Sequence, residues 1–367
     1  MFGWDIGGAH VKACWLQRGE VVEVLQWACP LWQGLDHLGA VLQDARARWP
    51  GLGAAQHAVT MTGEMVDLFA NREEGVRRIA AEFEQRLLTG SSTPDVVHFY
   101  AGDAGWCASA EVATHWEAIA SANWLATARH AALCTAKNAH EDGILVDIGS
   151  TTTDLIAFRG GRVLTTSRTD AQRLASGELV YHGVVRTPLC ALAQRIDWRG
   201  TPHNVMNEFF ATTADVYRLT GELTTAHDLH PSADNAPKDT RATCQRLARM
   251  VGLDQRDAAV GDWLDFARAW RAAQVAELAG QLRRVMAAHG LSRNAVVVSA
   301  GCGDFLVADV LAQARGGDGG SGEVVAHGCD IARVSAHARP SRSVVQAWAQ
   351  VCAPSVAVGA LFDQDHR

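Results

Sequence analysis

The spacing of apolar residues in the first part of the chain predicts alternating strands and helices. Apolar runs at residues 56–62 and 96–100 have the length of buried strands, whereas residues 36–49 and 71–88 carry apolar side chains at helical spacing. Residues 116–130 are rich in alanine and are predicted to form one continuous helix. This alternation favours a mixed or parallel sheet covered by helices.

The second part of the chain is richer in predicted helix. Its first apolar stretches, residues 144–158 and 162–166, predict strands joined through Gly160 and Gly161. Helical spacing then recurs over residues 208–219, 240–250 and 262–289, and a last helical pattern at 344–362 is interrupted near Pro354.

One short pattern occurs twice, as Asp5-Ile-Gly-Gly-Ala and as Asp147-Ile-Gly-Ser-Thr-Thr-Thr-Asp154, each time after an apolar run that predicts a strand. A strand, a tight turn with an aspartate and a return strand place a carboxylate beside exposed backbone N–H groups. That arrangement suits phosphate oxygens and their Mg²⁺. A single copy is also typical of a structural hairpin. The pair favours two related lobes that face one anionic ligand.

The paired turns contain the first candidate site residues. Asp5 and Asp147 are candidate ligands of Mg²⁺, partly through water, because this ion prefers oxygen ligands and keeps much of its hydration shell. The residues expected to bring N–H and hydroxyl groups to phosphate are Gly7, Gly8, Gly149, Ser150, Thr151 and Thr152. Lys12 is a further phosphate-binding candidate, and a solvated strand lysine is its alternative.

The composition narrows the class of protein. A chain of 367 residues is expected to form two domains, and 48% apolar with 20% charged residues is ordinary for a soluble globular protein. The net charge of −7 argues against nucleic-acid and membrane partners, and no apolar run is long enough to span a bilayer. Nine scattered cysteines without a C-x-x-C pair predict buried thiols in a cytoplasmic protein. Most of the twelve tryptophans are expected in the core or at subunit contacts, so a homodimer stays open.

The doubled turn resembles the two phosphate loops of the actin, Hsp70 and sugar-kinase superfamily. The resemblance implies an α/β, two-lobed actin-like ATPase (ribonuclease H-like) fold with an interlobe cleft. In that fold the terminal helix crosses back to the first lobe. The expected lobes are therefore residues 1–142 with 344–367, and residues 143–343 with a helical insertion. A strand at 294–299 that runs into Gly301, Cys302 and Gly303 resembles the element beside the adenosine, and ATP binding is left open.

Longer strings resemble a narrower family. They are Thr60-Met-Thr-Gly-Glu64, Asn71-Arg72-Glu-Glu-Gly-Val, Gly177-Glu178-Leu-Val-Tyr and Asn207-Glu-Phe-Phe-Ala-Thr-Thr. Together with both turns they resemble the hydantoinase/oxoprolinase-like proteins linked to tetrahydromethanopterin-dependent one-carbon metabolism. That family is similar to the archaeal methanofuran-biosynthesis synthase, and the resemblance runs nearly end to end.

The family resemblance implies a transferase acting on small molecules. Its reaction joins an aminomethylfuran-methyl diphosphate to the phenol of tyrosine or of a γ-glutamyltyramine-like acceptor, and it releases diphosphate. The superfamily resemblance taken alone implies an ATP-dependent small-molecule kinase or ATPase, which is the alternative enzyme. A non-catalytic nucleotide-binding protein is the alternative outside the enzymes. All of these need Mg²⁺ and oriented donors around a polyphosphate, so the aspartate turns do not choose among them.

The implied phenol, with a pKa of about 10, needs a base to react at neutral pH. Glu64, Asp154 and Glu178 are the candidate bases, since each stands beside a turn or a glycine in these strings. A structural, orienting carboxylate is the alternative for each. The candidates for holding phosphate or a substrate carboxylate are Arg72, Arg186 and Arg249, with interdomain ion pairs as the alternative.

Overall fold

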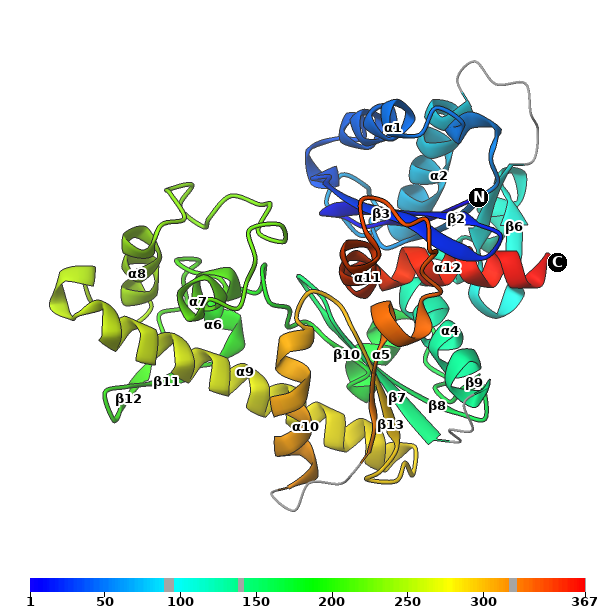
Figure 1. Cartoon of the computed structure of the whole chain (residues 1–367). Coiled ribbons are helices and arrows are strands. Elements are labelled where there is room, and N and C mark those ends of the chain that lie inside the picture. The colour runs from blue at the N-terminus through cyan, green and yellow to red at the C-terminus, as the bar shows by residue number, and fades with distance from the viewer. Residues whose placement is uncertain (89–95, 138–141, 317–321, 367) are drawn as a thin grey trace. The chain divides into compact units, whose positions relative to one another are not determined.

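The computed structural model of the chain describes residues 1–88, 96–137, 142–316 and 322–366 (Figure 1). They form two compact units of mixed α/β structure. Unit 1 contains Met1–Gly143, Ala157–Gln172 and Val324–Arg367, and unit 2 contains Ile144–Ile156 and Arg173–Glu323. The chain therefore leaves unit 1 and returns to it twice.

Unit 1 is built around a six-stranded sheet in the order β3-β2-β1-β4-β5-β6. β1 (Phe2–Ile6) pairs antiparallel with β2 (His10–Gln17) and parallel with β4 (His57–Met61). The other strands are β3 (Glu20–Ala28), β5 (Val97–Tyr100) and β6 (Trp106–Ala108). Every residue of β1 and β4 is buried, as expected of central strands covered on both faces. Because β1 and β4 are parallel, their carboxyl ends lie at the same edge of the sheet.

Helices cover the sheet of unit 1. They are α1 (Asp36–Arg48), α2 (Arg72–Leu88), α3 (Val112–Ile119), α4 (Asn123–Lys137), α11 (Arg342–Val351) and α12 (Ala353–Asp365). α12 packs on β1, β2 and β4 and comes closest at Gly3, where a Cβ atom would lie 2.1 Å from the carbonyl oxygen of Ser355. The first strand and the last helix of the chain are therefore neighbours within this unit (Figure 1).

The C-terminal helical segment is divided, as its sequence predicts. α11 ends at Val351 and α12 begins at Ala353, with Pro354 in the first turn of α12, where a proline is tolerated. In the described part of the chain no single helix is long and apolar enough to cross a membrane. Only α11 and α12 taken together, bent by 99°, reach that length and composition.

The predicted continuous helix at residues 116–130 is wrong. The segment forms the end of α3 and the start of α4, which are separated at residues 120–122. Ser121 in this break has a φ of +51°, a left-handed backbone conformation that cannot continue an α-helix. Alanine favours helix, but the Ser121 hydroxyl bonds to carboxylates that are distant in sequence. This tertiary contact accompanies the break and explains why local propensity does not prevail.

Unit 2 combines a sheet with a helical layer. In the sheet, neighbouring strands β7 (Asp142–Ile148) and β8 (Thr153–Arg159) are flanked by β13 (Val296–Ala300) next to β7 and β10 (Leu179–Val180) next to β8. The helices are α6 (Leu189–Leu192), α7 (Thr213–Thr220), α8 (Thr240–Arg249), α9 (Val260–Ala288) and α10 (Val307–Arg315). α9 packs against α7 and α10 and supplies much of the core of this unit.

Several shorter elements complete the chain. They are β9 (Arg162–Val163), α5 (Asp170–Ser176), β11 (Arg195–Trp198), β12 (Thr201–Asn204) and β14 (Val324–Ala326). α7 begins later than the prediction of a helix from residue 208. The backbone N–H of Thr212 donates to Asp215 Oδ2 at 3.1 Å, and this capping contact fixes the start of the helix at Thr213.

Candidate functional site

The first aspartate turn joins β1 to β2 in unit 1. The N–H of Gly7 donates to the carbonyl of His10 at 2.9 Å, which closes the turn. A Cβ on Gly8 would lie 2.8 Å from Val66 Cγ1, and a Cβ on Gly63 would lie 3.3 Å from the carbonyl oxygen of Gly7. The turn therefore packs closely against the segment that follows β4, which is where Glu64 lies.

Asp5 is buried at the end of β1, with 3% of its surface exposed. Its Oδ2 lies 3.6 Å from Lys12 Nζ, across the β1–β2 pair. Among the described residues, none gives a hydrogen bond to Asp5 Oδ1. Burial raises the pKa of this carboxyl, and the charge of Lys12 opposes the shift. A buried oxygen without a partner fits a cation or a donor supplied by a ligand.

The second aspartate turn joins β7 to β8 in unit 2. The N–H of Gly149 donates to Thr152 O at 2.8 Å. The segment after β10 clamps this turn, because Val184 N donates to Gly149 O at 3.0 Å and Arg186 N donates to Ser150 O at 2.8 Å. A Cβ on Gly183 would lie 2.3 Å from Thr151 N, so only glycine fits there. Ser150, Thr151 and Thr152 are half-buried.

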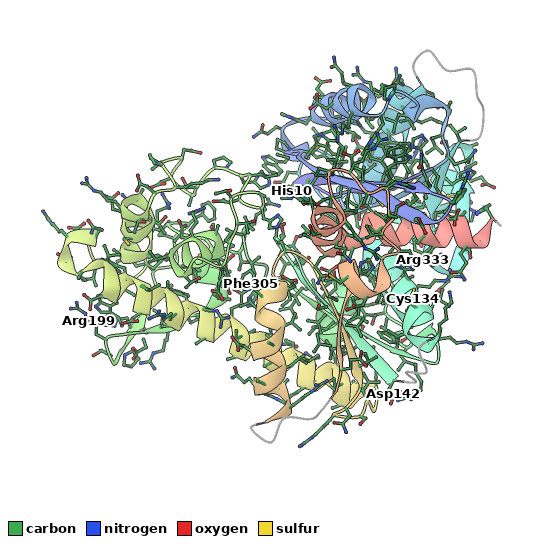
Figure 2. The ribbon with its side chains drawn as sticks, viewed as in Figure 1. His10, Cys134, Asp142, Arg199, Phe305 and Arg333 are labelled. Carbon is green, nitrogen blue, oxygen red and sulfur yellow. The ribbon has the colours of Figure 1, made fainter. Side chains whose placement is uncertain are left out.

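The predicted nucleotide-like element lies against this second turn. Gly301 has a φ of +88°, and a Cβ on it would lie 2.2 Å from Ile148 O and 2.6 Å from Asp147 Oδ1. Gly303 N donates to Ile148 O at 2.8 Å. The half-buried Cys302 stands between these glycines. Phe305, which is labelled in Figure 2, follows them, and its ring centroid lies 5.1 Å from that of Tyr217. The structure therefore brings residues 301–303 and Asp147 together.

Glu64 is completely buried directly after β4. Gly75 of α2 lies on its backbone, since a Cβ there would be 2.4 Å from Glu64 O. Ser121 Oγ lies 2.6 Å from Glu64 Oε1 and 3.1 Å from Asp170 Oδ2. Burial raises the pKa of Glu64 to about 7, and the hydrogen bond from Ser121 opposes this rise.

Ser121 and Asp170 were not predicted as site residues. Ser121 stands in an alanine-rich segment whose pattern predicts helix, and Asp170 opens a seven-residue helix without a motif. The only available signal was the pair of polar residues Ser121 and Asn123 within an otherwise apolar run.

The other two candidate bases already have ion-pair or hydrogen-bond partners within unit 2. Asp154 forms an ion pair with the buried Arg173. Glu178 accepts a hydrogen bond from Ser176 at 2.7 Å, and its Oε1 lies 2.9 Å from His289 Nε2. These contacts agree with the orienting role that the sequence left open for both residues.

The candidate arginines have different surroundings. Arg72, at the start of α2, lies over the ring of Trp116 at 5.7 Å and acts on Glu64 electrostatically. Arg186 is half-buried, and burial lowers its pKa. Arg249 is paired with Asp234 at 3.3 Å. Arg72 is therefore the arginine that the structure associates with Glu64.

The donor set suits an ion held largely by water and substrate. Within the ranges that the structure describes, no group of three or more His, Cys, Asp or Glu side chains is placed to hold a metal. Mg²⁺ typically binds one or two carboxylates together with substrate phosphates. The unpartnered Asp5 oxygen fits such an ion, and Asp5 and Asp147 stay the predicted ligands.

Comparisons with known proteins agree with the resemblance found in the sequence. The hydantoinase/oxoprolinase family model matches residues 56–354. A Methanocaldococcus jannaschii protein is 30% identical over 267 residues, 73% of this chain and 76% of its own length, and is named (4-{4-[2-(gamma-L-glutamylamino)ethyl]phenoxymethyl}furan-2-yl)methanamine synthase. A Methanococcus vannielii protein of the same name is 29% identical over 48% of this chain and 78% of its own length.

Among solved structures, a nucleotide-free structure of acetone carboxylase is similar with a TM-score of 0.54 and 12% identity, over 86% of this chain and 67% of that one. This likeness concerns the fold alone. The α/β fold class predicted from the sequence is confirmed. The prediction of an enzyme, a transferase, is confirmed by the two synthases. Since the family model spans most of its length, the chain belongs to the hydantoinase/oxoprolinase family.

Proposed function

We propose that this enzyme forms an aryl ether in the biosynthesis of a methanofuran-type cofactor. It joins an aminomethylfuran-methyl diphosphate to the phenol of tyrosine or of a γ-glutamyltyramine-like acceptor. The names of both relatives describe a furanylmethanamine that carries a phenoxymethyl group. That group contains the ether bond that this reaction makes.

Each bond change in this reaction requires a different group of the candidate site. The carbon–oxygen bond to diphosphate breaks, the phenol oxygen bonds to the same carbon, and the phenol proton passes to a base. Charge grows on the departing diphosphate. Asp5 and Asp147 would hold Mg²⁺, which would neutralise that charge, and the N–H and hydroxyl donors of both turns would bind the phosphate oxygens. Lys12 adds a positive charge beside the first turn.

Glu64 is the single observation that carries the proposal. It is buried, it lies after β4 beside the first turn, and its pKa is raised to about 7. A base with a pKa near the working pH takes up a proton efficiently while a large fraction of it is still ionised. A kinase or an ATPase transfers the phosphoryl group from ATP to another acceptor, and neither reaction requires a base for a phenol.

The test is a direct assay. Purified protein is incubated with Mg²⁺, the aminomethylfuran diphosphate and either tyrosine or γ-glutamyltyramine, and products are identified by mass. We expect ether and diphosphate in equal amounts, and Glu64→Gln should lower kcat by roughly a hundredfold or more. Glu73→Gln on the exposed side of α2 is the matched control, with activity close to that of the unchanged enzyme.

The alternatives give different products in the same assay. ADP formed from added ATP without ether would establish a kinase or an ATPase instead. Nucleotide binding without any turnover would establish a non-catalytic protein. Either result rejects the ether-forming function.

A further inference from the structure

One serine hydroxyl in unit 1 lies between two carboxylates. Ser121 Oγ is 2.6 Å from Glu64 Oε1 and 3.1 Å from Asp170 Oδ2. A hydroxyl carries one proton and can also accept a hydrogen bond. Ser121 therefore donates fully to only one carboxylate at a time, and the other carboxyl is best satisfied when it carries a proton and donates to Ser121.

The charges around Glu64 favour that shared proton. Glu64 is fully buried, and within the described part of the chain its Oε2 has no hydrogen-bond partner. Asp170, half-buried at the start of α5, disfavours a second negative charge on Glu64, whereas Arg72 favours it. Two neighbouring carboxylates, one of them buried away from water as Glu64 is, bind a shared proton more tightly than either would alone. With one proton on either carboxyl, Ser121 accepts from the protonated group and donates to the ionised one.

The backbone at Ser121 is held in an uncommon conformation. Its φ of +51° lies in the left-handed region, which is unusual and strained for a residue other than glycine. The break between α3 and α4 points the hydroxyl at both carboxylates. Strain that places one polar group between two others is the kind found at functional sites.

We propose that Ser121 and Asp170 are positioning residues that couple Glu64 to an exit path for its proton. Building on the proposed function, the phenol O–H bond breaks and an O–H bond forms on Glu64. The Glu64 proton then passes to Ser121 Oγ while the Ser121 proton passes to Asp170 Oδ2. Rotation of the Glu64 carboxyl group presents either oxygen to Ser121. Asp170 releases the proton to water, and Glu64 and Ser121 end as they began.

The coupling predicts opposite shifts in two variants. Ser121→Gly removes the hydroxyl that stabilises ionised Glu64, so the pKa of Glu64 should rise by about one unit. Asp170→Asn removes the neighbouring negative charge, so the pKa of Glu64 should fall by about one unit. Glycine also relieves the left-handed backbone, so Ser121→Gly is expected to fold.

The measurement is an infrared titration of the carboxyl groups, with Glu64→Gln used to assign the Glu64 band. It needs no substrate. Asn235→Gly controls for relief of a left-handed residue elsewhere, and Asp103→Asn controls for loosening of the segment before Asp170, because Asp103 pairs with Arg168. Neither control should change the pH at which the Glu64 band titrates. Unchanged titration in both test variants, or shifts in the same direction, would overturn the coupling.

The acid limb of the kcat/KM profile separates this proposal from the proposed function. Once ether formation is established, the acid limb should shift to higher pH in Ser121→Gly and to lower pH in Asp170→Asn. The kcat of Ser121→Gly should also fall by about tenfold, with KM little changed. Band shifts without any ether product would reject the proposed function and retain the coupling. If both variants form ether and the acid limb of their kcat/KM profiles stays where it is in the unchanged enzyme, the proposed proton path is wrong.

Discussion

The two aspartate turns share one sequence pattern and differ in how the protein holds them. In unit 1, Asp5 is buried beside Lys12, and the backbone N–H groups of Gly63 and Leu31 donate to Ile6 O and Gly8 O. In unit 2, Asp147 is half-buried, and backbone hydrogen bonds from residues 184–186 clamp the turn. Backbone hydrogen bonds hold both turns, and the two aspartates differ in burial, with Asp5 buried beside Lys12 and Asp147 half-buried.

This difference shows that the motif determines the turn, whereas the surrounding residues determine how buried its aspartate is. The pattern of an aspartate followed by small residues is sufficient for the turn. Burial then makes ionised Asp5 costly unless Lys12 or a bound cation balances it. Asp147 keeps more contact with solvent, so its charge is available to a hydrated ion at lower cost. We therefore expect the two aspartates to contribute unequally.

The largest expected effect comes from Asp147→Asn. The amide has nearly the same shape, so the fold should persist, while kcat should fall by roughly a hundredfold or more as charge stabilisation at the leaving group is lost. Asp5→Asn should show the same direction with a smaller loss. Ether formation at increasing Mg²⁺ measures both, and partial recovery at high Mg²⁺ is expected. If both variants lose thermal stability, seen as a lower Tm, along with their activity, the aspartates have a structural role.

The glycines around the turns give the next largest effect. A Cβ at Gly183 would meet backbone atoms of Ser150 and Thr151, so Gly183→Ala should lower the free energy of unfolding by about 3 kcal/mol and impair activity. At Gly8 the obstacle is one side-chain methyl group of the half-buried Val66, 2.8 Å away, and not backbone, so Gly8→Ala should cost less, about 1 kcal/mol. Chemical denaturation measures both values. A larger loss for Gly8→Ala would reverse the contrast between the turns.

The sequence predicted the parts of the site that repeat or that stand in a motif. Both aspartate turns, the strands that carry them and the glycines at 301 and 303 follow from local patterns. The structure places Gly301 against Asp147 and Gly303 against Ile148. Ser121 and Asp170 did not follow, because their role depends on which distant carboxylate they meet. Alanine-rich sequence around Ser121 even predicts the wrong element. Local propensity carries no information about such a tertiary contact.

The pH dependence of stability tests the burial of Glu64. Its pKa is 4.5 in an unfolded chain and about 7 in the fold. Below the unfolded value both states are protonated; between the two values only the unfolded state ionises, so stability falls as pH rises and stays lowered above the folded value. Glu64→Gln should remove this loss, worth on the order of 3 kcal/mol between about pH 4 and about pH 8.

The check is urea unfolding of both proteins across that range. Glu73→Gln, an exposed change in the same unit, should keep the slope of the unchanged protein. Parallel curves for Glu64→Gln and the unchanged protein would mean that Glu64 titrates normally and is not the buried base.

Lys12→Met should give the smallest effect, and it bears on the charge pair that distinguishes the first turn. Methionine keeps the length and packing of the half-buried lysine and removes its charge. If Lys12 holds the diphosphate equally in the ground and transition states, KM for the furan diphosphate should rise by about tenfold with kcat nearly unchanged. Removing the lysine also leaves burial of Asp5 unopposed, so its pKa should rise further and activity should decline at a higher pH on the acid side. Steady-state kinetics against pH separate the two consequences. An unchanged KM together with a shifted acid limb would assign Lys12 to Asp5 alone and remove it from the phosphate site.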